Sequence, residues 1–413
     1  MAEVPKITDF HKVVEPHLHG ATLESYESSY LTKPGDNYGS IMLSIKAKIK
    51  QPNGNKEELP LIAKLPPLTN DLYWQLFHPE RTCITENTVY KNLGPELDKL
   101  QLEAGVLPTK LFDGFSRYYG SRISLNENST VVDRDALLVQ ENLTVRGYKP
   151  GNRHDSYDLA HTVLILHYLA KFHALPIALR LKKPKVFYEK IRPHFNKFDM
   201  NENMDPSMKD MLSTETIADV KLVAKDNEKD IKRVDELFEL YNACNAGLEA
   251  DDGPYTSITH MDLWINNLMV KYDETGVPAK LKFIDFQITQ YESVVHDIIF
   301  LLLSSVDTKV VEENYHHLLR IYYNEFINTL NRMNVCTKAY SFESFMAEVQ
   351  RVAHLQIPHA LFMVKVVLAD NSTLPSEFKD MDMSVLSKNR GKETILNKVA
   401  DIMHLAKKFN FFY

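Results

Sequence analysis

The chain of 413 residues is 44% hydrophobic and 25% charged, which is ordinary for a soluble globular protein with a large core and room for two or three domains. Its formal net charge of -7 argues against nucleic acid as a main partner, because a surface that binds a duplex usually makes its domain basic. The three cysteines are widely separated, so we predict neither a disulfide framework nor a cysteine metal site.

The N-terminal stretch and the apolar runs bear on the location of the protein. The first residues contain an acid, a proline and no apolar core, so they do not resemble a secretory signal. The apolar runs at 298–303 and 360–369 are too short to span a bilayer. We therefore expect a cytoplasmic protein with no membrane span, and nothing in the sequence indicates an obligate protein partner.

The first third of the chain shows the alternation of apolar and polar residues that is typical of half-buried strands. The pair Asn53-Gly54 lies between two such segments and predicts a tight hairpin turn. Apolar residues at a spacing of three and four predict a helix over 82–93. The strands predicted in this part are 41–49, 59–65, 123–125 and 136–140.

From residue 155 onward the periodicity becomes helical. A strong amphipathic pattern covers 158–178, a charged stretch over 200–250 predicts one or two surface helices, and helical patterns return from 295 to the end. Short strands are predicted between these helices, at 255–258, 267–272 and 280–284.

The order of these patterns predicts a two-lobed α+β architecture. The N-terminal lobe, residues 1–142, would be small and β-rich, with a leading segment over 1–28. The C-terminal lobe, residues 143–413, would be larger and mainly helical. The loops between its short strands hold the most informative residues of the chain.

The segment 260–287 places a His, two Asp and an Asn at the spacing of a phosphoryl-transfer site. The order is His260-x-Asp262, then Asn267, then Asp285 at the end of a short apolar run. Such a site needs one carboxylate to orient and deprotonate an attacking hydroxyl, and an Asn and a second Asp to bind the Mg²⁺ ions that neutralise the phosphates. Each residue alone could be an ordinary loop side chain, but the full set at this spacing favours catalysis.

Two charged residues of the N-terminal part are candidates for the nucleotide half of the site. Lys64 ends a predicted strand, from which its ammonium can reach the α- and β-phosphates of ATP. Glu86 follows 22 residues later, in the predicted helix, and can pair with Lys64. A solvated lysine and an exposed helix carboxylate are the alternatives, and the downstream motif favours the pair.

Two further segments can bind a nucleotide through their backbone groups. A turn ahead of the first strand can close over the phosphates, although a simple strand-leading turn is an almost equal alternative. The candidate residues of this turn are Gly35, Asn37, Gly39 and Ser40. Where the strand 136–140 gives way to the helical part, backbone groups of Glu141 and Leu143 can bind the edge of an adenine.

The strings 260–267 and 284–287 resemble the ecdysteroid kinase-like family of arthropods, also called CHK kinase-like. They read His-Met-Asp-Leu-Trp-Ile-Asn-Asn and Ile-Asp-Phe-Gln. This family is a branch of the protein-kinase-like superfamily, near the choline kinases and the aminoglycoside phosphotransferases. Further matches include Glu86 with Tyr90, Glu141-x-Leu143 and the string 169–174, so the resemblance covers most of the chain.

The resemblance implies a bilobal protein-kinase-like fold, ATP and Mg²⁺ as cofactors, and transfer of the γ-phosphate to a hydroxyl of a small lipophilic acceptor. The acceptor is an ecdysteroid in the type member, and xenobiotic detoxification has been suggested for the wider family. By position, Asp262 would be the catalytic base, Asn267 and Asp285 the metal ligands, and Lys64 the phosphate-binding lysine.

Two departures from the family pattern bear on activity. Met261 stands where the family usually has Gly, and its thioether can crowd the loop. Asn142 replaces the Asp of the usual Glu-Asp-Leu string, which is a milder change. A pseudokinase that binds nucleotide without turnover is therefore one alternative, with Met261 as its support.

The second alternative is a kinase of choline, ethanolamine or a sugar. A cationic acceptor would need an acidic or aromatic pocket, whereas a steroid needs a long apolar one. We expect the acceptor pocket in the helical lobe. Four residues there are candidates to line it, although it is the favoured alternative that they belong to the hydrophobic core. These candidates are Phe345, His354, Pro358 and Phe362.

Overall fold

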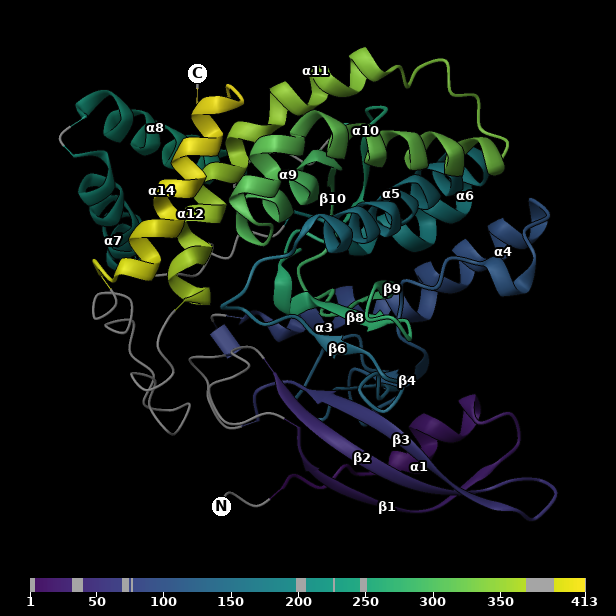
Figure 1. Ribbon diagram of the computed structural model, residues 1–413. Coiled ribbons are helices and arrows are strands. Elements are labelled where there is room, and N and C mark those ends of the chain that lie inside the picture. Colours follow the sequence, from purple (N-terminus) through teal and green to yellow (C-terminus); the bar gives the residue numbers. More distant parts are fainter. Residues whose placement is uncertain are drawn as a thin grey trace.

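The computed structural model has two parts, a sheet formed by the N-terminal third of the chain and a larger body of helices formed by the rest (Figure 1). The predicted two-lobed α+β fold is confirmed. The residues that the structure describes are 4–31, 40–68, 74–75, 77–197, 206–225, 227–245, 251–368 and 390–412.

The N-terminal sheet contains five antiparallel strands in the order β1-β2-β3-β5-β4. They are β1 (Thr22–Tyr30), β2 (Ile41–Lys50), β3 (Lys56–Leu65), β4 (Tyr118–Arg122) and β5 (Leu137–Glu141). Apolar and polar residues alternate along β2, so that one face packs with α1 (Phe10–Val14) in a buried cluster. The predicted strands 41–49, 59–65 and 136–140 are confirmed, although β3 begins earlier than expected.

The strand predicted at 123–125 is wrong, because the chain leaves the sheet there and β4 lies just before it. The sequence pattern is obscured by Gly120, which α1 approaches closely: a Cβ at this position would lie 2.2 Å from the Val13 carbonyl oxygen. After β4, a hydrogen bond of 2.6 Å from the Ser124 hydroxyl to Asp133 closes a loop. The strand therefore ends where polar side chains turn the chain.

The helix predicted over 82–93 is confirmed but extends in both directions. α3 (Pro79–Thr88) continues through a π-helical turn (Val89–Leu93) into α4 (Gly94–Glu103). Pro79 occupies the first turn, where its missing N–H costs little. Val89 and Leu93 are fully buried in the core of the helical part, so this helix joins the sheet to the helices.

The helical part is built around α5 (Leu159–Lys182), which packs along α10 (Thr308–Arg332). Among the described helices, α5 alone is long and apolar enough to cross a membrane, and 72% of its most apolar window is buried inside the protein. The other helices of eight residues or more in the described part are α7 (Pro206–Ala224), α8 (Glu228–Asn245), α9 (Val295–Ser304), α11 (Phe342–Val352), α12 (Gln356–Val367) and α14 (Glu393–Lys408).

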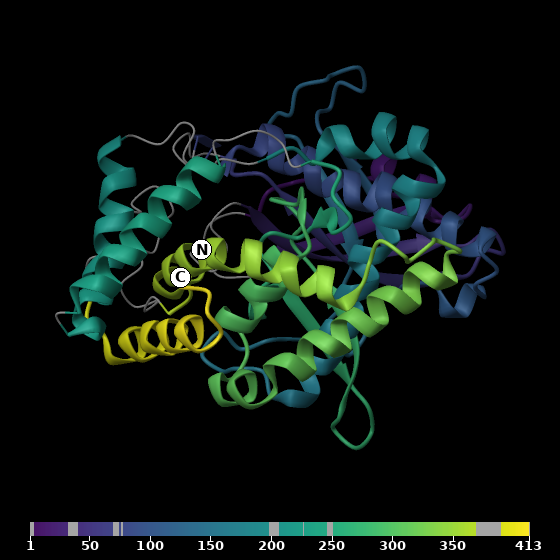
Figure 2. The same cartoon turned by 90° about the horizontal axis from the view of Figure 1, so that it is seen from above.

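Helices α7, α8, α12 and α14 form one group at the side of the helical part (Figure 2). One or two surface helices were predicted within 200–250, and the structure has two there, α7 and α8. They are less exposed than expected, because Val220, Val234 and Leu237 are fully buried. Phe345 is also a core residue and does not line a pocket, since it is 1% exposed and packs on the rings of Tyr255 and Tyr322.

Two small sheets carry the segments that the sequence singled out. One pairs β7 (Thr256–Thr259) with β10 (Gln290–Ser293), and the other has the order β6-β8-β9. The strands of the second are β6 (Lys149–Pro150), β8 (Leu268–Tyr272) and β9 (Pro278–Phe283). The loop after β7 and the loop after β9 therefore lie between the two sheets, and these loops hold the predicted catalytic residues.

Candidate functional site

Lys64 contacts two carboxylates that come from distant parts of the chain. Its Nζ lies 2.6 Å from Glu86 Oε2 and 2.7 Å from Asp285 Oδ1. Lys64 lies on β3, Glu86 on α3, and Asp285 after β9. The side chain of Lys64 is 11% exposed and that of Glu86 is 5% exposed, so water screens the pair only weakly. The structure thus joins the two predicted halves of the site.

The charge of this cluster is unbalanced. Burial alone would lower the pKa of Lys64, but the negative charges of Asp285 and Glu86 outweigh burial and raise it. Burial raises the pKa of Glu86, and Lys64 opposes that shift. One ammonium is therefore held between two carboxylates, which leaves a surplus of negative charge.

Asp262 and Asn267 lie together in the loop after β7. The Asn267 side-chain N–H donates to the Asp262 carbonyl oxygen at 2.8 Å and to its carboxylate at 2.9 Å. Burial, and after it the charge of Asp285, raises the pKa of Asp262 to about 7. The loop therefore presents a carboxylate that releases its proton near neutral pH.

A buried carboxylate that the sequence analysis did not identify, Asp297 of α9, fixes this loop. It accepts hydrogen bonds from the backbone N–H of His260 at 2.7 Å and of Met261 at 2.8 Å. Its third partner is His173 of α5, at 2.9 Å, which also contacts the Tyr322 hydroxyl at 2.8 Å. Burial raises the pKa of Asp297, but its contacts with His173 and His260 outweigh burial and lower it. Its carboxylate therefore stays ionised and holds the loop.

His260, which was predicted to be catalytic, is completely buried and contacts both loops. Its Nε2 lies 2.9 Å from the carbonyl oxygen of Ile284, the residue before Asp285. Its Nδ1 accepts a hydrogen bond from the backbone N–H of Asp262 at 3.3 Å. Burial lowers the pKa of His260, which favours the neutral ring with one donor and one acceptor. One imidazole thus links the Asp262 loop to the Asp285 loop.

Met261 and Asp285 both have left-handed backbone conformations, with φ of 65° and 64°. This region costs a residue with a side chain roughly 1–2 kcal/mol, whereas Gly adopts it freely. The structure therefore explains why a Gly suits position 261. The two N–H groups held by Asp297 keep Met261 in this conformation.

Gly35, Asn37 and Gly39 lie outside the described residues, and Ser40 lies half-buried just before β2. Glu141 is the last residue of β5, and its N–H donates to the Arg117 carbonyl at 2.9 Å. The N–H groups of residues 146 and 148 both donate to the carbonyl of Leu143, which forms a tight turn after the strand. Glu141 and Leu143 are thus placed at the junction of sheet and helices, as the sequence predicted.

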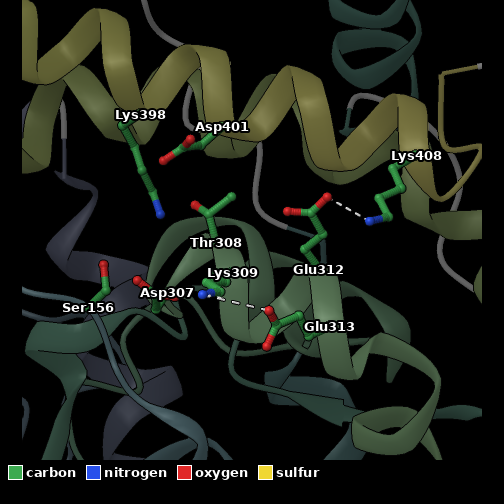
Figure 3. A pocket seen from close by; sticks show the side chains of 9 residues that line it. All are labelled: Ser156, Asp307, Thr308, Lys309, Glu312, Glu313, Lys398, Asp401 and Lys408. Atoms are coloured by element: carbon green, nitrogen blue, oxygen red, sulfur yellow. Dashed lines mark hydrogen bonds and ion pairs between the residues drawn. The ribbon is translucent and has the colours of Figure 1, made fainter.

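A second polar cluster lies away from all of these residues, between the start of α10 and α14 (Figure 3). Its lysines have carboxylate neighbours: Lys408 lies 2.6 Å from Glu312, and Lys309 lies 3.8 Å from Glu313. The lining residues are Ser156, Asp307, Thr308, Lys309, Glu312, Glu313, Lys398, Asp401 and Lys408. None of them belongs to the predicted site.

The fold and the Lys64–Glu86–Asp285 cluster beside Asp262 are typical of a kinase-type phosphotransferase. A sequence model of the ecdysteroid kinase-like family matches residues 34–335. The chain therefore belongs to the ecdysteroid kinase-like family, and by class it is a small-molecule kinase. This confirms the resemblance that the two sequence strings indicated.

Comparisons with curated proteins and with solved structures do not narrow the activity beyond this family. Comparison with curated proteins gives no match. One solved structure that the chain matches is a glucosamine kinase in complex with glucosamine, ADP and inorganic phosphate. It shares 11% sequence identity with a TM-score of 0.30, over 88% of this chain and 100% of that chain.

Proposed function

We propose that the protein transfers the γ-phosphate of ATP to a hydroxyl of a small lipophilic acceptor, an ecdysteroid or a xenobiotic. The observation that carries the proposal is the contact of Lys64 with both Glu86 and Asp285. Nothing in the local sequence requires residues on β3, α3 and the loop after β9 to meet, so their convergence indicates a shared task. Charge that is concentrated on one ammonium and two carboxylates suits a polyanionic nucleotide with its metal ion.

The residues also fit a magnesium site. The Asn267 amide nitrogen donates to Asp262, so the side-chain carbonyl oxygen of Asn267 is the atom left to act as a ligand. Asp285 would supply a second hard oxygen ligand, and one or two protein oxygens are what Mg²⁺ usually takes in a nucleotide site. Mg²⁺ bound there would neutralise the charge on the phosphates.

Each polar residue of the site has a separate task in this proposal. Lys64 has three N–H donors, of which two bond Glu86 and Asp285, so one remains for a phosphate oxygen. Asp262 would accept a hydrogen bond from the acceptor hydroxyl, orient it for in-line attack and take its proton late in the transfer. Asn267 would keep the Asp262 carboxylate facing the hydroxyl.

The ecdysteroid kinase-like family supports the choice of a lipophilic acceptor. A choline, ethanolamine or sugar acceptor remains the second candidate, and each class would need a different pocket. A cytoplasmic location is part of the proposal. The cysteines support it, because Cys83, Cys244 and Cys336 are all free thiols.

A mass-spectrometric acceptor screen tests the proposal. The protein would be incubated with ATP, Mg²⁺ and panels of ecdysteroids, other hydroxylated lipophiles, plant glycosides and choline. Transfer adds about 80 Da, the mass of one phosphoryl group, to the acceptor. We expect a product from the wild type that Asp262→Asn does not form. Nucleotide binding with no product from any acceptor would contradict the proposal and favour a pseudokinase.

A further inference from the structure

Helix α3, which carries Glu86, is attached to the helical part by two side chains on one of its faces. The guanidinium of Arg81 donates to the backbone carbonyl oxygens of Asn196 and Lys197. Four residues further along the same face, the Thr85 hydroxyl donates to the His194 carbonyl oxygen at 3.2 Å. All three acceptors belong to one short segment, residues 192–197, which we name the strap.

The strap is itself fixed to β10. The backbone N–H of Tyr291 donates to the Phe195 carbonyl oxygen at 2.8 Å, and Phe195 is fully buried. The Lys197 ammonium lies 3.3 Å from Glu292 and donates to the Cys244 carbonyl oxygen of α8 at 2.9 Å. The strap therefore has little freedom to move independently of β10.

Strand β10 in turn is continuous with the catalytic loops. It pairs with β7, with Gln290 opposite Thr259, the residue before His260. It also begins five residues after Asp285 in the chain. A displacement of α3 would therefore be transmitted through Arg81 and the strap to β10 and β7, the strands next to the loops that hold Asp285 and Asp262.

We propose that Arg81 is a positioning residue for phosphoryl transfer, which holds α3 through the strap so that Glu86 stays on Lys64. The inference rests on the proposed function, since it assigns Arg81 to the nucleotide half of that site. Glu86 reaches Lys64 from the buried side of α3, and the helix has to keep its position for the 2.6 Å contact to persist. Without Arg81, α3 would lose two of its hydrogen bonds to the strap and keep that of Thr85, and Lys64 would turn toward Asp285.

A double-mutant cycle on nucleotide affinity tests this proposal. The dissociation constant of ATP with Mg²⁺ would be measured by calorimetry for the wild type, Arg81→Ala, Glu86→Gln and the double variant. We expect Arg81→Ala to weaken binding about tenfold, in line with the loss of charge-assisted hydrogen bonds. We expect no further loss when Arg81→Ala is added to Glu86→Gln, because Arg81 acts through Glu86.

A purely structural role for Arg81 would give a different pattern. Equal losses in the wild-type and Glu86→Gln backgrounds, or no loss in the wild type, would overturn the proposal. Arg332→Ala is the matched control, since Arg332 is 61% exposed and lies 3.7 Å from Glu325, and it should leave ATP affinity unchanged. If Arg81→Ala does not fold, Arg81→Lys should weaken binding about threefold, since it keeps the charge but offers a single contact.

The outcome is independent of the acceptor. The readout is nucleotide binding, so a protein that phosphorylates no acceptor in the screen can still pass or fail this cycle. Thr85→Val removes the second contact to the strap without changing the size of the side chain. It should weaken ATP binding less than Arg81→Ala does, and a larger effect would contradict the leading role of Arg81.

Discussion

Two groups of charged side chains in the described part of the protein differ in charge balance. In the first, Lys64 is surrounded by Glu86 and Asp285, with Asp262 near enough to Asp285 for the charges to interact. In the second, Lys365 of α12 lies 2.7 Å from Asp219 and 3.8 Å from Glu215, both on α7. Arg390 adds a second cation to that group.

The second group is neutral, with two cations and two carboxylates, and it joins α7, α12 and the chain just before α14. The first has one cation and three carboxyl groups, of which Asp262, with a pKa of about 7, is only partly ionised at neutral pH. Buried charges are costly unless they are compensated, so a surplus that is retained in a fold indicates a binding partner of opposite charge. We infer that the neutral group stabilises the helices, and that the surplus at the site is held for a cation.

The largest effect should follow from removing the negative charge of Asp285, the proposed metal ligand of the first group. Asp285→Asn should lower the rate of phosphoryl transfer by about a thousandfold or more, because a ligand that offsets phosphate charge is lost. It should not lower the melting temperature, since it relieves carboxylate repulsion. The measurement is product formation from the best acceptor, with a thermal melt alongside. A rate within tenfold of the wild type would contradict the assignment.

Breaking the neutral group should give the opposite pattern. Lys365→Met should destabilise the protein by about 3 kcal/mol, because it leaves Asp219 and Glu215 buried with one cation fewer. Activity per folded molecule should change little. Urea unfolding at pH 7 measures the loss. An unchanged midpoint together with a large loss of activity would show that the two groups had been assigned the wrong way round.

The raised pKa of Asp262 predicts that the stability of the wild type and of Asp262→Asn will differ in its dependence on pH. A carboxyl with a pKa of about 7 in the folded protein, raised from 3.8, binds its proton more tightly when folded. Stability therefore falls as pH rises from about 4 to about 7 and then levels off. Asp262→Asn removes this slope, so its melting temperature should exceed that of the wild type by about 5 °C at pH 8 and match it at pH 4. A constant difference across this range would count against the raised pKa.

The smallest effect concerns the backbone. Met261→Gly should stabilise the protein by about 1 kcal/mol or less, because relief of the left-handed strain is partly offset by the greater unfolded-state entropy of Gly. The rate of phosphoryl transfer should stay the same or rise. Paired urea unfolding and kinetics check both. A fall in both quantities would mean that the Met261 side chain makes contacts the loop needs.

Local sequence spacing predicted the Asp262 loop well, because two short strands and a turn connect it to Asp285 and leave few possible arrangements. The pairing of Lys64 with Glu86 was also predicted, from a lysine at a strand end and a glutamate in a helix 22 residues later. The Asp285 contact to Lys64 needed the structure, because 221 residues separate the two. The assigned roles of these residues stay predictions.

Asp297 was missed although a signal exists: an acid lies inside the apolar run of α9, where a charge needs a buried partner. That partner is the backbone of the catalytic loop, which no side-chain pattern can show. The position of β4 was missed for a similar reason. Gly120 is required by the approach of α1, a tertiary contact that propensity does not record.

We infer that the surplus negative charge beside Lys64 is held for a cation that comes with the nucleotide. Calorimetric titration of ATP in Mg²⁺ and in EDTA, on the wild type and on Asp285→Asn, tests it most directly. We predict that the wild type binds ATP at least tenfold more tightly with Mg²⁺, and that Asp285→Asn loses most of this difference. Equal affinity of the wild type in Mg²⁺ and in EDTA would contradict the account.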